Sequence, residues 1–229
     1  MSTLALLGGL GTTTAIWEPQ LEAFEEAVAF DLPGHGAEPL PHGEVTIATI
    51  GASLLERLPA RFSFCGVSIG GMVGMWIAAN APDRVDRLVL ACTGAKLGER
   101  ADYEARARLV RSEGVGVVVE GARERWFTSA FRDTPEAQAV IDALASTDPE
   151  GYAACCEAVG RFDFRGELHR IGAPTLALFG ERDPMTPPDV RETLIAGIPD
   201  VRAAEIAGAA HLACVEQPDA FTDHLRSVA

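Results

Sequence analysis

The sequence predicts an α/β fold with a doubly wound, mainly parallel sheet and a helical insertion. Two observations support this prediction. Short apolar runs with strand character alternate with segments of helical spacing, which is typical of parallel sheets covered by helices. A strand-free stretch, rich in Ala, Arg and Glu, interrupts this alternation between the fourth and fifth strands. The strands are expected at residues 3–7, 27–31, 62–65, 86–92, 174–180 and 201–206.

Helices are expected between these strands where apolar residues recur at helical spacing. Residues 46–58 show this spacing most clearly, and Pro59 ends the segment. The run 72–80 is apolar on nearly all faces, so the helix there should be buried on both sides. Pro19 suits the first turn of a helix over residues 17–25. Two further helices are expected at residues 189–197 and 218–228.

The strand-free stretch spans residues 96–165, and we expect it to form a helical lid on a core built from residues 1–95 and 166–229. Ligands of parallel sheets bind outside the carboxyl ends of the strands. The glycine-rich and serine-containing turns of this chain each follow a strand. They should therefore lie together at the carboxyl ends of the strands, which predicts a site at that edge of the sheet. Turn-forming residues divide the lid into several helices, with breaks at 114–116, 134–135 and 148–149.

The composition excludes several classes of protein. The chain has 229 residues, enough for one large domain with a substantial core. Its net charge of −14 argues against nucleic acid, which requires a basic surface. No apolar run has the length of a membrane span, and the first nine residues lack the basic region of a signal peptide. We therefore expect a soluble cytoplasmic protein.

The five cysteines lack C-x-x-C spacing and are expected to be buried rather than bound to metal or each other.

The segment around Ser68 predicts a catalytic serine. Residues 66–70 have the pattern G-x-S-x-G between an apolar strand and a buried helix, the context in which this pattern presents a nucleophile. Glycines two residues on either side let the two backbones pass closely and tolerate a strained turn. The alternative is a glycine-rich turn with an incidental serine, which the apolar flanks disfavour.

A serine hydroxyl needs a base, and a carboxylate must orient that base. In such a fold the three residues occur in the order serine, acid, histidine. His211 follows the last strand in a loop of small residues and is the expected base, whereas His224 lies inside the last helix. Asp183 follows the preceding strand and is the expected acid, although an Asx turn could also explain it. The competing carboxylates, which suit a helix cap and a turn, are Asp189 and Asp200.

Backbone N–H groups are expected to stabilise the oxyanion that forms on attack. We call the sharp turn at Ser68, between the strand and the helix, the elbow. In such an elbow the N–H of the residue directly after the serine, here Ile69, is one of these donors. Leu10, in the glycine-rich loop after the first strand, supplies the other. Neither G-x-x-x-x-G-K-[ST] nor G-x-G-x-x-G occurs, so this loop does not predict a nucleotide site. The chemistry needs no metal or organic cofactor.

Several motifs resemble the α/β-hydrolase superfamily and, more closely, the 3-oxoadipate enol-lactonases of the β-ketoadipate pathway of aromatic catabolism. The resemblance covers nearly the whole chain. The core motifs by themselves imply only a serine hydrolase, whereas the lid motifs favour the lactonase. The core motifs are residues 30–36, 66–75, 78–85 and 210–218, and the lid motifs are residues 124–128 and 152–158.

The resemblance implies that the substrate is an enol-lactone with a carboxymethyl group, opened through an acyl-enzyme. An anionic substrate of an acidic protein calls for a cation in the pocket. The resemblance points to Arg125, whose planar fork would hold the carboxylate, beside Trp126, which would pack against the ring. A surface arginine over a core tryptophan is the alternative. A general carboxylesterase of small acyl esters and a ligand-binding protein without turnover also remain open.

Two departures from the superfamily bear on the expected structure. Gly8-Gly9 precede Leu10 where many relatives have His-Gly, which would loosen the loop. The chain also starts at what would be the third strand of the superfamily. The strand at residues 27–31 would then be an uncovered edge, and we hypothesise that it pairs with a second copy to form a homodimer.

Overall fold

A computed structural model describes residues 3–227 of the chain. Six strands form one sheet in the order β2-β1-β3-β4-β5-β6, and each neighbouring pair is parallel. The chain builds the sheet outward from β1 to β2 and then crosses to β3 on the other side, which confirms the doubly wound arrangement. The strands are β1 (Thr3–Leu7), β2 (Ala27–Phe30), β3 (Phe62–Val67), β4 (Val85–Ala91), β5 (Thr175–Gly180) and β6 (Val201–Ile206).

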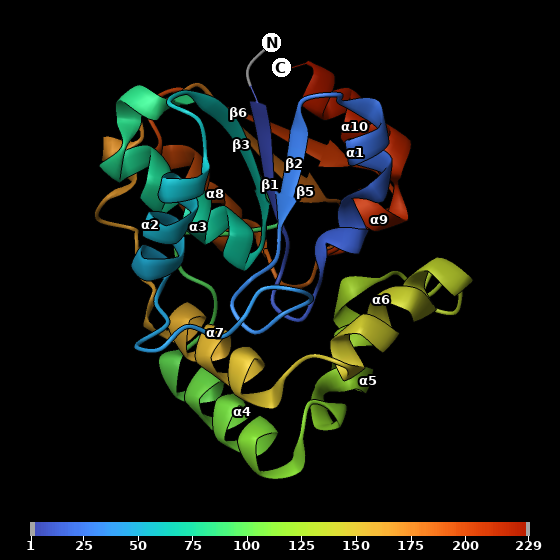
Figure 1. Cartoon of the computed structure of the whole chain (residues 1–229). Helices are drawn as coiled ribbons and strands as arrows, with labels where there is room; N and C mark the ends of the chain where they lie inside the picture. Colours follow the sequence, from blue (N-terminus) through green and yellow to red (C-terminus); the bar gives the residue numbers. More distant parts are fainter. Residues whose placement is uncertain (1–2, 228–229) are drawn as a thin grey trace.

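Helices cover both faces of the sheet (Figure 1). One layer contains α2 (Ile47–Arg57), α3 (Ile69–Asn80) and α8 (Pro188–Gly197), and the other contains α1 (Glu18–Ala23) and α10 (Pro218–Arg226). Because helices shield both faces, strands β3 and β5 are buried along their whole length. Short helical segments complete the core: η1 (Thr14–Trp17), η2 (Pro82–Arg84), η3 (Leu168–Arg170) and α9 (Ala213–Glu216).

The apolar helix after the serine is α3, and it is buried on nearly all sides as predicted. It lies between α2 and the strands β3 and β4. It has 12 residues, and in the described part of the chain no helix combines the length and apolar character that a bilayer crossing requires.

The strand β2 forms one edge of the sheet, as the sequence predicted for residues 27–31. Its Val28 is 39% exposed. The homodimer predicted to form at this edge stays a prediction.

Four helices lie between β4 and β5: α4 (Arg100–Glu113), α5 (Gly116–Trp126), α6 (Pro135–Ala145) and α7 (Pro149–Arg161). They lie beyond the carboxyl ends of the strands (Figure 1). The helix breaks fall where the sequence predicted them. Side chains cap two of the helices, because Thr134 accepts the N–H of Ala137 at 3.2 Å and Asp148 accepts that of Gly151 at 2.7 Å. We call residues 96–165 the lid segment, and their division from the core stays a prediction.

The lid segment contacts the core where α7 begins. A Cβ atom on Gly34, in the turn after β2, would collide with the Cα of Gly151, and a Cβ on Gly151 would collide with Gly34. The two backbones therefore touch, which only glycine at both positions permits. At the base of the segment, the N–H of Phe164 donates to the carbonyl of Ala95 at 2.8 Å and joins its two ends.

Candidate active site

Ser68 lies in a strained turn between β3 and α3. Its φ of 57° and ψ of −118° belong to a region that non-glycine residues rarely adopt. Close backbone contacts on either side hold this turn in place. A Cβ on Gly66 would collide with the carbonyl of Gly70, and one on Gly70 would collide with the carbonyl oxygen of Leu7. The glycines of the G-x-S-x-G pattern are thus required by packing.

Hydrogen bonds from the next strand support the elbow. The N–H of Ser68 donates to the carbonyl of Ala91 at 3.0 Å, and the Thr93 hydroxyl donates to the carbonyl of Ser68 at 2.7 Å. Thr93 is fully buried, so its hydroxyl has a structural partner rather than a solvent one. The sequence did not predict this contact, because it depends on the alignment of β3 with β4.

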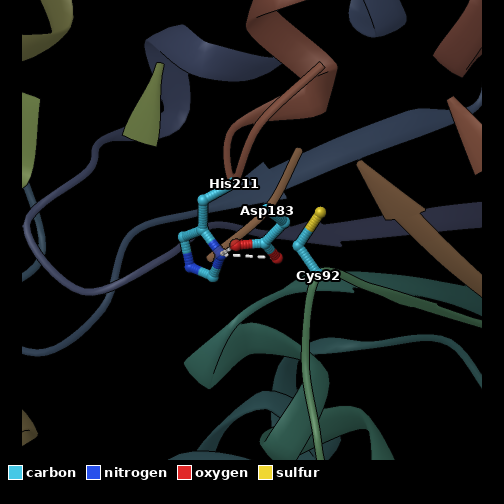
Figure 2. A group of neighbouring side chains, drawn as sticks. All are labelled: Cys92, Asp183 and His211. Carbon is cyan, nitrogen blue, oxygen red and sulfur yellow. Dashed lines mark hydrogen bonds and ion pairs between the residues drawn. The ribbon is translucent and has the colours of Figure 1, made fainter. Parts of the chain in front are cut away.

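The structure brings together the predicted base and acid (Figure 2). His211 Nδ1 lies 3.0 Å from both carboxylate oxygens of Asp183. The two residues come from loops after β6 and β5, which are neighbours in the sheet. Both side chains are buried, so solvent screens their interaction little. The contact leaves the Nε2 atom of His211 available for a second partner.

Two further groups hold the Asp183 carboxylate. The N–H of Met185 donates to Oδ1 at 2.8 Å, and the hydroxyl of Thr186 donates to Oδ2 at 2.7 Å. Burial by itself raises the pKa of Asp183, but the charge of His211 and the three hydrogen-bonding partners outweigh it and lower the pKa below the ordinary value. Asp183 is therefore ionised at neutral pH. The contact with Met185 is the predicted Asx turn, and it coexists with the histidine contact.

Ser68 and His211 border the same cavity, and Leu10 of the β1 loop borders it too. Lid residues form its other side. The free volume in this conformation is small, about 30 Å³, so a ligand of the size of a lactone requires side chains to move. The lid residues that line this catalytic cavity include Tyr103, Arg106, Ala122, Arg125, Trp126 and Tyr152.

The two predicted oxyanion donors lie on either side of the elbow. Ile69 is the first residue of α3, and the first N–H groups of a helix have no acceptor within it. Leu10 lies in the loop after β1. The hydroxyl of Thr12 donates to the carbonyl of Gly9 at 2.9 Å, and the N–H of Thr12 donates to the same oxygen at 3.1 Å. These two bonds brace the loop internally, and the loosening expected from Gly8-Gly9 stays a prediction.

His35 is a site residue whose role sequence reasoning missed. Its Nε2 atom accepts the N–H of Gly11 at 3.0 Å, and its Nδ1 atom lies 2.9 Å from the carbonyl of Pro33. This pairing requires the neutral tautomer with the proton on Nδ1. Burial lowers the pKa of His35, which favours the same form. His35 thus ties the oxyanion loop to the turn after β2. The motif at residues 30–36 pointed to this segment without indicating its contact.

Trp126 and Arg125 both border the catalytic cavity, as the resemblance implied. Trp126 is buried, and its carbonyl accepts the N–H of Leu212 at 3.0 Å, which joins the end of α5 to the loop of His211. Arg125 is half-buried and forms no ion pair among residues 3–227. The carboxylate-binding role of Arg125 stays a prediction, and so does the alternative of a surface arginine. Tyr103, Arg106 and Tyr152 were not predicted to be in the site.

A third side chain lies beside the histidine and the aspartate (Figure 2). One ligand atom each of Cys92, Asp183 and His211 lies within 4.8 Å of the others, a spacing that a metal ion could bridge. Burial raises the pKa of the Cys92 thiol well above its ordinary range, so the thiolate that a metal prefers is disfavoured. Both oxygens of Asp183 already accept hydrogen bonds. These contacts suit an aspartate that orients the imidazole better than a metal ligand. As predicted, all five cysteines are buried and unpaired.

Comparison with known proteins places this site in a family. The model of the alpha/beta hydrolase family matches residues 4–224. The chain belongs to the alpha/beta hydrolase family. The hydrolase is 36% identical to 3-oxoadipate enol-lactonase 2 of Acinetobacter baylyi, over 98% of this chain and 87% of that protein.

Solved structures of similar proteins agree with this assignment. The enol-lactonase from Burkholderia xenovorans superposes on the hydrolase with a TM-score of 0.94 at 31% identity, covering 100% of this chain and 91% of that one. A thermophilic esterase from Thermogutta terrifontis, solved with malate bound, has a TM-score of 0.91 at 27% identity, covering 99% of this chain and 89% of that one. The similarity therefore includes the lid segment as well as the sheet.

Proposed function

We propose that this hydrolase opens 3-oxoadipate enol-lactone to 3-oxoadipate through an acyl-enzyme. The observation that carries the proposal is the charge of the catalytic cavity. Its lining contains the guanidinium groups of Arg106 and Arg125 and no acidic side chain, in a protein with a net charge of −14. A carboxylate-bearing substrate would be attracted to this cavity and repelled elsewhere. The similarity to 3-oxoadipate enol-lactonase 2 of Acinetobacter baylyi supports this substrate, and the enol-lactonase of Burkholderia xenovorans supports an enol-lactone.

In the first step, the Ser68 hydroxyl attacks the carbonyl carbon of the lactone while His211 Nε2 takes the hydroxyl proton. Asp183 orients the imidazole through Nδ1 and stabilises its positive charge, which its ionised state allows. The N–H groups of Leu10 and Ile69 donate to the oxyanion of the tetrahedral intermediate. A preformed, strained elbow keeps Ser68 in position for this attack.

Collapse of the intermediate breaks the ring C–O bond, and the protonated His211 supplies a proton to the enolate oxygen. The enol then converts to the more stable ketone, which makes ring opening effectively irreversible. In the second step, His211 takes a proton from water, and the resulting nucleophile attacks the acyl-enzyme ester. His211 then returns this proton to the oxygen of Ser68, whose bond to the acyl carbon breaks, and the second carboxylate of 3-oxoadipate is released.

Arg125 and Trp126 determine substrate choice in this proposal. A guanidinium holds a carboxylate through two parallel hydrogen bonds, and the indole packs against the small ring. The small volume of the cavity favours a compact substrate. The esterase from Thermogutta terrifontis was solved with malate bound, a small dicarboxylate, which agrees with an anionic ligand.

A general carboxylesterase of small acyl esters is the second candidate. The similarity to that esterase favours it, and Ser68 and His211 of this chain could hydrolyse an acyl ester by the same steps. A binding protein without turnover is disfavoured, because the strained Ser68 has a free-energy cost that binding would not require.

The test compares turnover of the enol-lactone with that of p-nitrophenyl acetate, a neutral ester. We expect the lactone to have the higher kcat/KM and Ser68→Ala to abolish turnover of both. In Arg125→Gln, the ratio of lactone to ester kcat/KM should fall about ten-fold, the effect of one charge-assisted hydrogen-bonding partner. An unchanged ratio contradicts the assignment of Arg125, and a wild type that prefers the ester supports the carboxylesterase.

A further inference from the structure

We infer that Arg106 is a second carboxylate-binding residue, located where the substrate enters the catalytic cavity, and that it binds one carboxylate together with Arg125. The inference rests on the anionic substrate of the proposed function, but it concerns a residue for which neither the sequence nor the family resemblance indicated a role.

Arg106 lies at the boundary between two hollows. With Tyr103 and Met185 it lines the catalytic cavity, and the same three residues also line an outer cavity of about 520 Å³. The outer cavity is large enough for a small acid, whereas the inner one is nearly closed in this conformation. The path between them therefore runs past these three side chains. Tyr103 and Arg106 are one turn apart on α4, so a small movement of this helix or its side chains widens the path.

The charge of Arg106 is not neutralised by a neighbouring carboxylate. Several lid arginines are paired, as in Arg111 with Glu150 at 2.8 Å and Arg161 with Glu44 at 2.5 Å. Arg106 forms no ion pair within the described residues 3–227. A half-buried guanidinium without a counter-ion is unfavourable by itself, which points to an anion that is supplied by the ligand.

Aromatic side chains hold the Arg106 guanidinium without neutralising it. Its Cζ atom lies 5.1 Å from the centroid of the Tyr103 ring, a cation–π contact. It also interacts with the hydroxyl of Tyr152, which lines the same cavity. Burial raises the pKa of Tyr152 to about 12, so this hydroxyl stays protonated and offers no negative charge. The other N–H groups of Arg106 make no hydrogen bond to residues 3–227 and can therefore donate to a ligand.

The two guanidinium groups are near enough to affect one another. Burial lowers the pKa of Arg125, and the charge of Arg106 lowers it further. Two like charges in a partly buried site repel, and a carboxylate between them relieves the repulsion while accepting hydrogen bonds from both. Each of its two oxygens has two lone pairs, which suffices for two guanidinium forks.

The experiment measures inhibition of p-nitrophenyl acetate hydrolysis by adipate, with the neutral adipamide as the comparison ligand. The variants are Arg106→Gln and Arg125→Gln, and the matched control is Arg108→Gln, an exposed arginine on the same helix. We expect the inhibition constant of adipate to rise about ten-fold or more in Arg106→Gln, as for loss of a charge-assisted hydrogen bond. Adipamide should inhibit all forms equally, and Arg108→Gln should resemble the wild type.

The double variant tests the shared ligand. If both arginines bind one carboxylate, the double variant should lose less than the product of the two single effects, since each single variant already breaks the joint site. Equal adipate inhibition in Arg106→Gln and the wild type, or equal weakening in Arg108→Gln, overturns the inference. Should Arg106→Gln fail to fold by circular dichroism, Arg106→Met, which keeps the length of the aliphatic stem, takes its place.

The assay does not use the enol-lactone. Adipate inhibition that depends on Arg106 supports the carboxylate site even if the wild type fails to open the lactone, a result that would refute only the proposed function. Conversely, lactone turnover with adipate inhibition that is independent of Arg106 refutes only this inference.

Discussion

The N–H of Gly11 donates to Nε2 of His35 at 3.0 Å, and this bond joins the loop after β1 to the turn after β2. The imidazole is fully buried and accepts only because it is neutral. The position of Leu10, the proposed oxyanion donor, therefore depends on a histidine 25 residues away that does not line the catalytic cavity.

Replacement of His35 should lower both stability and activity. In His35→Ala the N–H of Gly11 loses its buried acceptor, which we expect to reduce the free energy of unfolding by about 1–3 kcal/mol. The loop then loses its constraint, so kcat should fall about ten-fold while KM changes little. Urea denaturation and ester turnover measure the two effects. His42→Ala, at an exposed histidine of the following loop, is the control and should match the wild type.

His35 also predicts a pH dependence of stability. Its pKa in the folded state lies below the ordinary value of 6.5, so the unfolded chain binds a proton more readily. The stabilisation is complete above pH 6.5 and decreases as the pH falls below it, with a slope of at most about 1.4 kcal/mol per pH unit. Asp183, whose pKa is lowered in the folded state, stabilises the fold fully above pH 3.8, its ordinary pKa. This stabilisation decreases only when the pH falls below that value. Unfolding measured between pH 7.5 and 5 should thus show a smaller slope for His35→Ala, and an identical slope would contradict the assignment.

The contacts of Asp183 predict graded losses of activity. Asp183→Asn should reduce kcat by about 10³–10⁴-fold, because the amide no longer stabilises the charged imidazole. Thr186→Val removes the hydroxyl that donates to Oδ2 and should reduce kcat by about ten-fold or less, with KM nearly unchanged. Thr193→Val, which removes an exposed hydroxyl of α8, is the control. Steady-state kinetics on a neutral ester separate these outcomes, and wild-type kcat in Thr186→Val would exclude its positioning role.

The contact between Gly34 and Gly151 predicts a strong effect of one methyl group. A Cβ at Gly151 meets backbone that cannot rotate away, so Gly151→Ala should lower the free energy of unfolding by about 1–3 kcal/mol and displace α7. The added methyl at Gly172 meets no atom within 4 Å, so Gly172→Ala is the control. Thermal melts and the KM for a neutral ester measure the change. Equal melting temperatures would show that the lid segment adjusts without cost.

The edge strand β2 carries the prediction of a homodimer. Val28→Lys places a charge on the exposed edge, where it should prevent strand pairing without disturbing the core. Size-exclusion chromatography with light scattering at micromolar concentration should then show a dimer for the wild type and a monomer for the variant. A wild-type monomer rejects the hypothesis.

Much of the fold followed from local patterns. The strands depend on apolar periodicity, the helix breaks on turn residues and the elbow on glycine. Each of these signals acts over a few residues and can be recognised in the sequence. The acid and the base could be predicted as well, because Asp183 and His211 each follow a strand and the carboxyl ends of neighbouring parallel strands lie together.

The tertiary structure alone decided which further side chains share the site. Arg106 is one of 19 basic residues, and nothing in its local sequence distinguishes it from the paired arginines of the lid. Its position depends on how α4 packs against α5 and α7, and its lack of an ion pair within residues 3–227 depends on which carboxylates lie out of reach. The same holds for His35, whose partner Gly11 is distant in sequence. Ser68, Asp183 and His211 could be found from the chain because strand order and turns place them, whereas the charge of the cavity is set by packing between helices that sequence patterns do not specify.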